Sequence, residues 1–305
     1  MDLPNRASVV IVGGGVVGCS LAYHLTLRGC TDVVLLERKQ LTCGTTWHAA
    51  GLVGQLRASY NMTRLAQYTT NLYATLEQET GQATGFRQTG SMSVATNAAR
   101  MEELLRGASM AKCFGLEVHT MTPSEIASTW QGVTTSDLVG GVFLPKDGRC
   151  NPIDTTQALA RGAKNRGAKI FENTPVEKIL IENGKAVGVR TAGWEIRADM
   201  VVNCAGMWAH ELGAQTGTTV PLHAAEHFYI VTEPMAGLHA DLPVMRDPDN
   251  CAYFKEDAGK LLVGWFEPIA KPWGMQGIPE TFCFDQLPDD LEHIEPLLAS
   301  AMERI

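Results

Sequence analysis

The sequence lacks any concentration of positive charge. Its 305 residues include 25 lysines and arginines against 33 aspartates and glutamates, which gives a formal net charge of −8. Proteins hold nucleic acids through basic surfaces, so this balance argues against a nucleic-acid partner. Charged residues make up 19% and hydrophobic residues 45% of the chain, which predicts a soluble, globular protein.

The cysteines also lack a pattern. Eight are present, but no two form a CxxC pair and their spacing is irregular. Structural zinc sites and disulfide frameworks both need such groupings. We therefore expect no metal site and no disulfide framework, and we predict a reducing compartment.

Long uninterrupted apolar runs are missing as well. Three consecutive glycines break the run from Ala7 to Ala22, and His24 and Arg28 follow it on a helix-like pattern. A cleaved signal or a membrane span needs an unbroken apolar segment. Only six residues precede the run, too few for a transit peptide. We expect a cytoplasmic protein without a membrane span, or a processed form such as one in the mitochondrial matrix.

A glycine-rich motif near the N-terminus is the first positive signal. The β-branched run 9–12 predicts a buried parallel strand, and Gly13, Gly15 and Gly18 follow it in GxGxxG order. An apolar helix pattern comes next, and the second strand, "DVVLLE", ends at Glu37. The order strand, glycine loop, helix, strand and acid predicts dinucleotide binding.

Each part of this motif has a physical role. Gly13 permits the tight turn from strand to helix, Gly15 lets the backbone approach a pyrophosphate, and Gly18 lets the helix pack closely on the strand. The N-terminus of the helix offers unpaired N–H groups to the phosphates. The carboxylate of Glu37 can accept hydrogen bonds from an adenosine ribose.

The segment after Glu37 favours FAD over NAD. It reads "RKQLTCGTTWHAAGL", a stretch of small residues without a strand pattern. Thr45 and Thr46 can cover the pyrophosphate with backbone amides and hydroxyls. Ala49 and Gly51 leave room for the main chain to lie against a flat ring. These features suit a cofactor that is buried along its whole length.

"GTTWHAAGL" after such a motif resembles the dimethylglycine dehydrogenase and sarcosine dehydrogenase family. These proteins belong to the D-amino-acid-oxidase-like FAD oxidoreductases, and the chain resembles their N-terminal, FAD-dependent part. The segments 72–96, 201–213 and 242–247 carry the resemblance further along the chain. It implies that the histidine of TWHAAG, here His48, carries FAD through a covalent bond to the flavin 8α carbon.

The residues around His48 are consistent with this role. Small neighbours leave space for a flavin edge beside the imidazole, and a covalent link would raise the electron affinity of the ring. The alternative is an ordinary buried histidine that bonds to backbone. The cofactor contacts predicted from the motif and the resemblance are Gly13, Gly15, Gly18, Glu37, Arg38, Thr45, Thr46, His48, Ala49, Gly51, Val176, Ala205 and Gly206.

The remaining patterns predict an α/β fold. Helices are expected over 61–80, 98–112, from Thr122, from Asn151 to about Arg166, and over 289–304. Strands are expected over 90–96, 138–145, 174–182, 185–191, 195–206, 221–233, 251–257 and 260–268. We expect a Rossmann-type FAD-binding domain, residues 1–85 and 150–216, interleaved with an antiparallel-sheet (α+β) substrate domain, residues 86–149 and 217–305.

The resemblance also implies that the substrate domain is truncated at the C-terminus. Members of the family continue well beyond this length, with a further segment that contacts the flavin and a folate-binding region. Tetrahydrofolate is therefore expected only if a missing C-terminal domain exists. We expect helix 289–304 to leave an apolar face uncovered, and the activity of this chain alone is in doubt.

The reaction implied by the resemblance is oxidative N-demethylation of dimethylglycine or sarcosine. Hydride leaves the N-methyl carbon for the flavin, and water or a folate takes the one-carbon unit. An alkylamine has a pKa of about 10.4, so the site must take up its proton at neutral pH. His227 is the candidate acceptor and Tyr253 the candidate hydrogen-bond donor to substrate, although a structural role for both is the ordinary reading.

A substrate carboxylate calls for an arginine. Arg57 is the first candidate, with Arg87 and Arg246 as alternatives, and the role of Glu226 stays open. The alternatives for function are another FAD-dependent amine or amino-acid oxidase of the same fold, a non-catalytic regulatory relative, and an NAD-dependent dehydrogenase. The electron acceptor, a flavoprotein or oxygen, does not follow from the sequence.

Overall fold

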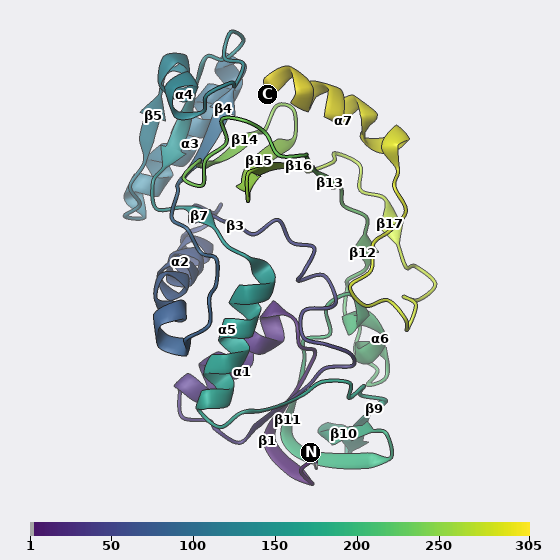
Figure 1. Cartoon of the computed structure of the whole chain (residues 1–305). Coiled ribbons are helices and arrows are strands. Elements are labelled where there is room, and N and C mark those ends of the chain that lie inside the picture. The colour runs from purple at the N-terminus through teal and green to yellow at the C-terminus, as the bar shows by residue number, and fades with distance from the viewer. Residues whose placement is uncertain (1–2) are drawn as a thin grey trace.

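The two large β-sheets lie at opposite ends of the molecule, with helices and long loops between them (Figure 1). This architecture comes from a computed structural model that describes residues 3–305. The helices are α1 (Val16–Leu27), α2 (Tyr60–Thr80), α3 (Ala98–Cys113), α4 (Pro123–Thr129), α5 (Pro152–Asn165), the short 3₁₀ turn η1 (Gly206–Trp208), α6 (Ala209–Ala214) and α7 (Leu291–Arg304).

The first sheet has six strands and confirms the Rossmann-type expectation. In spatial order they are β8 (Lys169–Phe171), β2 (Val33–Leu36), β1 (Arg6–Val12), β11 (Trp194–Asn203), β10 (Lys185–Thr191) and β9 (Lys178–Glu182). The first four are parallel, and β11, β10 and β9 pair antiparallel. Residue Val12 pairs with both Leu36 and Asn203. The carboxyl ends of three neighbouring strands therefore meet where the glycine loop begins, which is where open α/β sheets bind their ligands.

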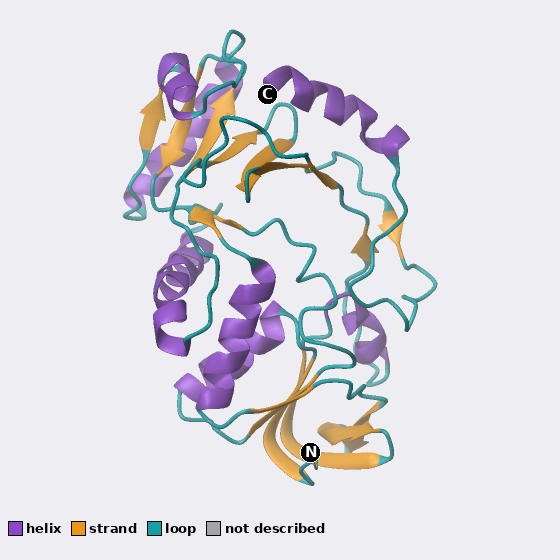
Figure 2. Ribbon diagram, viewed as in Figure 1, coloured by secondary structure: helices purple, strands orange, loops and turns teal. Residues whose placement is uncertain are grey.

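Apolar side chains bury both faces of this sheet, and helices lie against it (Figure 2). Ile11 and Leu35 pack with residues of α1, α5 and α2 in one cluster, while Val10 and Val34 pack with residues of β9, β10 and α6 in another. Alternate residues of a strand point to opposite faces, so an unbroken apolar run is needed where both faces are covered. This is why runs 9–12 and 33–36 carry no polar residue.

The second sheet has seven strands. In order they are β13 (Tyr229–Val231), β16 (Lys260–Trp265), β15 (Ala252–Asp257), β14 (Val244–Asp247), β4 (Ser91–Ala95), β6 (Gly140–Leu144) and β5 (His119–Met121). The predicted antiparallel pairing is confirmed except at β14 and β4, which run parallel. Two ribbons complete the strands: β3 (Leu52–Val53) with β7 (Gly148–Arg149), and β12 (Ala224–Ala225) with β17 (Pro272–Trp273).

Local signals in the sequence placed several element ends correctly. The helix expected from Thr122 starts there, where Thr122 and Glu125 form a capping box, and the Asn151 side chain caps α5. Gly81 ends α2 with a left-handed φ of 68°. Asn183 and Gly184, with φ of 51° and 74°, form the tight turn between the strands expected over 174–182 and 185–191.

The expectation of one long strand over 221–233 is wrong. The segment forms two short strands, β12 and β13, with residues 226–228 between them. There the N–H of Glu226 bonds to the carbonyl of Lys271, and the N–H of Phe228 bonds to the Glu267 side chain. The backbone therefore leaves the hydrogen-bonded β-ladder at His227.

A second difference from the expected elements is β3, which forms within the glycine- and alanine-rich segment where no strand was expected.

The expectation of an uncovered apolar face on the last helix is also wrong. Ile294 and Ala301 of α7 are each 4% exposed and pack in the core cluster of the seven-stranded sheet. The indole N–H of Trp265 donates to the carbonyl of Leu297. At the end of α7, Arg304 is 3% exposed.

Arg304 joins α7 to the sheet through two carboxylates. Its Nε donates to Oδ2 of Asp247 at 2.8 Å, and its Nη atoms donate to both oxygens of Asp137 at 2.7 and 2.8 Å. Asp247 is fully buried.

Within residues 3–305, no helix has both the length and the apolar character that a membrane crossing requires.

Candidate active site

Two cavities adjoin one another between the sheets. One, of about 640 Å³, is lined by the glycine loop and the ends of β1 and β2, and we name it the glycine-loop cavity. The other, of about 490 Å³, is lined by residues of β3, α2, β14 and β15, and we name it the sheet cavity. Thr46 lines both. A long ligand can therefore extend from one cavity into the other past this residue.

The glycine loop has the geometry that a close backbone approach requires. Gly13 has a φ of +113°, and a Cβ there would lie 2.2 Å from the carbonyl oxygen of Cys204. A Cβ at Gly18 would lie 1.9 Å from the carbonyl oxygen of Gly13. At Gly15 the nearest atom to such a Cβ is the Thr46 hydroxyl, at 3.1 Å. Gly13 and Gly18 thus serve internal packing, and Gly15 faces the cavity that the loop lines.

Glu37 lies where the motif predicts, 7% exposed and on the wall of the glycine-loop cavity. Its Oε2 accepts the N–H of Gly14 at 2.7 Å, and its Oε1 accepts the N–H of Lys39 at 2.9 Å. The carboxylate therefore fixes the glycine loop to the second strand. Oε1 also accepts the thiol of Cys43 at 3.8 Å, so Oε2 is the oxygen that keeps a lone pair for a further donor.

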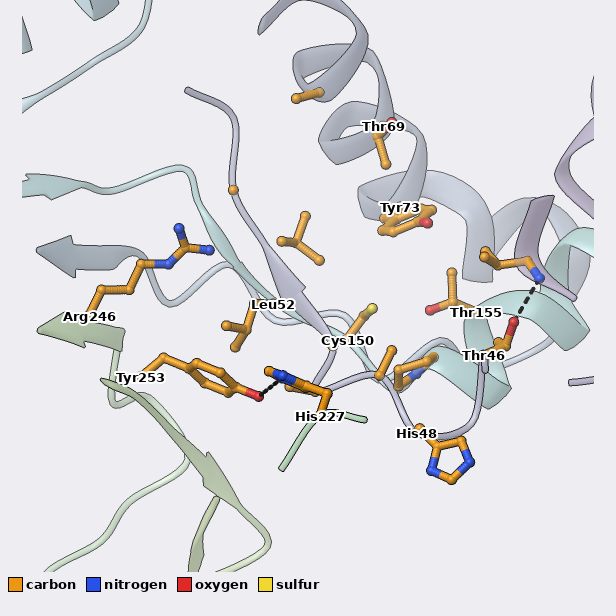
Figure 3. Close-up of a pocket in the computed structure, with 18 of the residues that line it drawn as sticks. Thr46, His48, Leu52, Thr69, Tyr73, Cys150, Thr155, His227, Arg246 and Tyr253 are labelled. Carbon is orange, nitrogen blue, oxygen red and sulfur yellow. Dashed lines mark hydrogen bonds between the residues drawn. The ribbon is translucent and has the colours of Figure 1, made fainter. Parts of the chain in front are cut away.

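The N-terminus of α1 opens toward the same wall. Gly15 supplies no side-chain cap, and the hydroxyl of Thr46 accepts the N–H of Val16 at 3.0 Å (Figure 3). The N-terminus of a helix attracts negative charge. The predicted contacts Thr45, Val176, Ala205 and Gly206 line this cavity with the loop.

Arg38 lines the glycine-loop cavity too, but its side chain has protein partners. Its guanidinium donates to the carbonyl oxygens of Glu280 and Phe282 and lies 4.0 Å from the ring centre of Trp208. Segment 278–285 thereby returns from the second half of the chain onto the cofactor loop. No local pattern predicts this contact, because it joins residues more than 240 positions apart.

His48 is half-buried and lines the sheet cavity together with Ala49 and Gly51. Its ring lies nearly parallel to that of Phe282, at 6.4 Å, and in Figure 3 it is turned away from the His227–Tyr253 pair. Burial lowers the pKa of His48, so the imidazole is neutral at pH 7. Gly51 has a φ of +75°, and a Cβ there would lie 2.1 Å from the carbonyl oxygen of Cys150.

His227 and Tyr253, predicted as catalytic, meet in the sheet cavity. The Nε2 of His227 lies 3.2 Å from the Tyr253 hydroxyl (Figure 3). Tyr253 is 2% exposed, and its ring lies across Gly264, where a Cβ would be 2.2 Å from the phenol. Burial raises the pKa of Tyr253, and nearby Tyr229 and Glu267 add to the rise. The phenol is therefore protonated and can act as a hydrogen-bond donor.

The alternation of the strands places a cation beside this pair. Met245 and Phe254 point into the core, so their neighbours Arg246 and Tyr253, which pair across β14 and β15, face the cavity. No hydrogen bond or ion pair holds the Arg246 guanidinium among residues 3–305. Burial lowers the pKa of Arg246, and Arg57 lowers it further.

The charges around Arg246 favour an anionic ligand. Arg57, the first candidate for binding a carboxylate, lines the same cavity and is exposed, and its guanidinium donates to the carbonyl of Leu56. The nearest balancing carboxylate, Asp147, is 3% exposed and already accepts from Gln55 and Ser91. Two guanidinium groups thus share one occupied carboxylate.

The sequence did not point to Glu267, and it offered Arg246 only as an alternative to Arg57, together with Arg87. Glu267 follows β16 and accepts from His227 across the sheet end, a contact set by tertiary structure. Arg87, the other alternative, lies elsewhere and faces Asp241 at 3.9 Å. Glu226, whose role was open, faces Lys271 at 3.6 Å. An alternating pattern around Arg246 in a strand was the one signal that could have separated the three arginines.

One unpaired donor of the loop after β2 fits a long polar cofactor. Arg38 Nε is buried, has no partner within the described chain, and belongs to a residue that lines the glycine-loop cavity. Together with the glycine loop, the acid and the helix N-terminus, this donor defines a dinucleotide-binding oxidoreductase fold of the flavoprotein class.

The comparisons with known proteins agree with this class. Residues 8–305 match the family DAO, described as FAD dependent oxidoreductase, and the chain belongs to that family. It is similar in fold to L-proline dehydrogenase from P.horikoshii, with a TM-score of 0.87, 24% identity, and coverage of 99% of this chain and 78% of that one.

The similar proteins include those predicted from the sequence. The chain is 40% identical to 4-methylaminobutanoate oxidase (formaldehyde-forming) of Paenarthrobacter nicotinovorans, over 98% of this chain and 36% of that protein. It is 38% identical to human (Homo sapiens) mitochondrial sarcosine dehydrogenase, over 99% and 33%. It is also 38% identical to the mitochondrial pyruvate dehydrogenase phosphatase regulatory subunit of Mus musculus, over 99% and 35%. The chain thus spans about a third of the length of these relatives.

Proposed function

We propose that the chain is the FAD-dependent part of an enzyme that oxidises a small N-methylated amino acid, with sarcosine or dimethylglycine as substrate. The observation that carries the proposal is the sheet cavity. There a protonated tyrosine bonded to a histidine lies beside an arginine that has no hydrogen-bond or ion-pair partner among residues 3–305. Relatives with 38–40% identity are named for the oxidation of such compounds, which supports the same substrate class.

We propose that FAD extends through both cavities. Glu37 would hold the ribose, Gly15 and the N-terminus of α1 the pyrophosphate, and Thr46 the passage to the sheet cavity. Ala205 and Gly206 offer the small surface that a cofactor needs for close approach. When bound, FAD supplies the acceptor for two electrons and the methyl hydrogen.

We also propose that residues 1–85 and 150–216 form the FAD-binding domain. Residues 86–149 and 217–305 then form the substrate domain.

The chain's own residues would prepare the amine. The Arg246 guanidinium, with Arg57, would hold the substrate carboxylate and so fix the amine relative to Tyr253. Tyr253 and His227 would take up the ammonium proton, because only the neutral amine has the lone pair that assists loss of a hydride. The apolar rings of Phe266 and Tyr73 would exclude water.

The function is tested by anaerobic mixing of the flavin-loaded protein with sarcosine or dimethylglycine. We expect either compound to bleach the yellow absorbance of the flavin. Glycine, which lacks a methyl group, should leave this absorbance unchanged. A flavin that binds but does not bleach with any N-methylated amino acid would favour the regulatory reading, which the similarity to a phosphatase regulatory subunit supports.

Replacing Arg246 by alanine should weaken the binding of carboxylate-bearing amines about 10- to 100-fold, since a charge-assisted hydrogen bond contributes about 1.5–3 kcal/mol. The measurement is the substrate concentration for half-maximal bleaching. Arg87→Ala, which removes an exposed arginine elsewhere, is the matched control. If Arg246→Ala weakened the binding of an N-methylated amine equally whether or not the amine carries a carboxylate, Arg246 would not be the residue that binds the carboxylate.

We propose that the flavin is covalently linked to His48, whose neutral imidazole has the free lone pair that such a bond requires. His48→Ala should release all yellow colour into the supernatant on acid precipitation, whereas the unchanged protein should keep it in the pellet. The control is His24→Ala, which removes a histidine on α1 that bonds to Tyr68. It should behave as the unsubstituted protein. Colour in the supernatant of the unchanged protein would refute the link.

A further inference from the structure

A carboxylate lies behind the histidine of the sheet cavity. The Glu267 side chain is 7% exposed, and its Oε2 lies 3.2 Å from Nδ1 of His227. Its other oxygen, Oε1, accepts the N–H of Phe228 at 3.1 Å. Glu267 does not line the cavity, so it cannot touch a ligand there. It contacts the backbone and the ring of the segment that carries His227.

The neighbours of the ring favour one tautomer of neutral His227. A carboxylate only accepts, so Nδ1 carries the hydrogen and donates to Glu267, and Nε2 keeps a lone pair for the Tyr253 hydroxyl. A carboxylate behind an imidazole both orients the ring and stabilises the imidazolium that forms when the free nitrogen gains a proton.

We propose that Glu267 is a positioning residue for a proton relay from substrate through Tyr253 to His227, an inference that rests on the proposed function. The N–H bond of the substrate ammonium breaks, and its electron pair stays on nitrogen. The proton passes to the Tyr253 oxygen as the original phenol proton passes to Nε2 of His227. The positive charge leaves the substrate and comes to lie on the imidazole, against Glu267.

The surroundings of the pair support this direction of transfer. Among the groups that face it, Glu267 is the carboxylate in contact with the imidazole. The Arg246 cation lies on the Tyr253 side, and Tyr229 adds a second phenol there. The Tyr253 and His227 rings are nearly parallel, at 15°. A proton that moves toward Glu267 thus moves away from the arginine and toward negative charge.

The test is Glu267→Gln in the flavin-loaded protein, with anaerobic reduction by sarcosine followed across pH. Glutamine has no charge and keeps one oxygen to accept the Nδ1–H, while its NH₂ cannot accept the N–H of Phe228. We expect reduction at pH 7 to slow about tenfold, and the acidic limb of the rate profile to move to lower pH by about one unit. The substrate concentration for half-maximal rate should change little, because Glu267 does not reach the cavity.

Glu226→Gln is the matched control, since Glu226 faces Lys271 and lies one residue from the same histidine. It should leave the profile unchanged. A purely structural role for Glu267 predicts an unshifted profile in Glu267→Gln, which would overturn the inference. In a His227→Gln background, Glu267→Gln should cause no further loss, because its effect passes through the histidine. An additive loss there would also overturn it.

The experiment distinguishes failure of the proposed function from failure of the relay. If no N-methylated amino acid reduces the flavin of the unsubstituted protein, both the proposed function and the relay are overturned. If the unsubstituted protein is reduced and Glu267→Gln has the same pH profile, the role of Glu267 alone is overturned.

Discussion

Replacing His227 by glutamine is expected to slow flavin reduction by an N-methylated amino acid roughly 10²- to 10⁴-fold, the contribution typical of a general base. The reason is the geometry of the pair: Nε2 of His227 is the acceptor that the buried Tyr253 hydroxyl contacts, at 3.2 Å. Without it, the substrate proton has no destination inside the cavity. The measurement is the rate of anaerobic bleaching after rapid mixing, at saturating substrate.

His223→Gln is the control for this prediction, because His223 is exposed and lines neither cavity. It should leave the rate unchanged. Tyr253→Phe should also slow reduction strongly and keep the flavin bound, since it removes only the hydroxyl. A His227→Gln protein that bleaches at the unchanged rate would remove the histidine from the chemistry.

Replacing Arg304 by methionine is expected to lower the free energy of unfolding by about 3–5 kcal/mol, the cost of leaving a buried charge without its partner. Arg304 is 3% exposed, and the carboxylate of Asp247 behind it is fully buried. The substitution keeps most of the side-chain volume but leaves Asp247 without its cation. The measurement is the urea midpoint together with its slope.

Arg190→Met serves as the control on stability. Arg190 pairs with Glu195 at 2.6 Å, but both side chains are about half exposed, at 45% and 44%. An ion pair of this kind contributes only about 0–1 kcal/mol. Equal losses from the two substitutions would show that α7 does not depend on its buried ion pair for docking to the sheet.

Local chemistry made much of the fold and of the cofactor site predictable. Gly13 and Gly18 follow a strand at the spacing that close packing demands, and the structure shows backbone where their Cβ atoms would be. The Thr122 capping box and the turn at Asn183 and Gly184 depend only on residues a few positions apart. Such signals survive in a sequence because the tertiary structure is not needed to read them.

The features that were missed depend on distant contacts. The seven-stranded sheet has one parallel pair, in which β14 lies beside β4 although the paired residues Val244 and Ser91 are 153 positions apart. The face of α7 is covered because Ile294 meets the core of that sheet, which periodicity alone does not reveal. Glu267 acquires a role only because the chain leaves the ladder at His227 and brings the two side chains together.

We propose that one flavin extends from the glycine loop to the sheet cavity and is held beside residue 48. Trypsin releases residues 40–57 as a single peptide that contains one histidine. After acid precipitation and digestion of the flavin-loaded protein, the mass of this peptide should be raised by that of the bound flavin. A peptide of unmodified mass, with the flavin recovered free in the supernatant, would contradict the account.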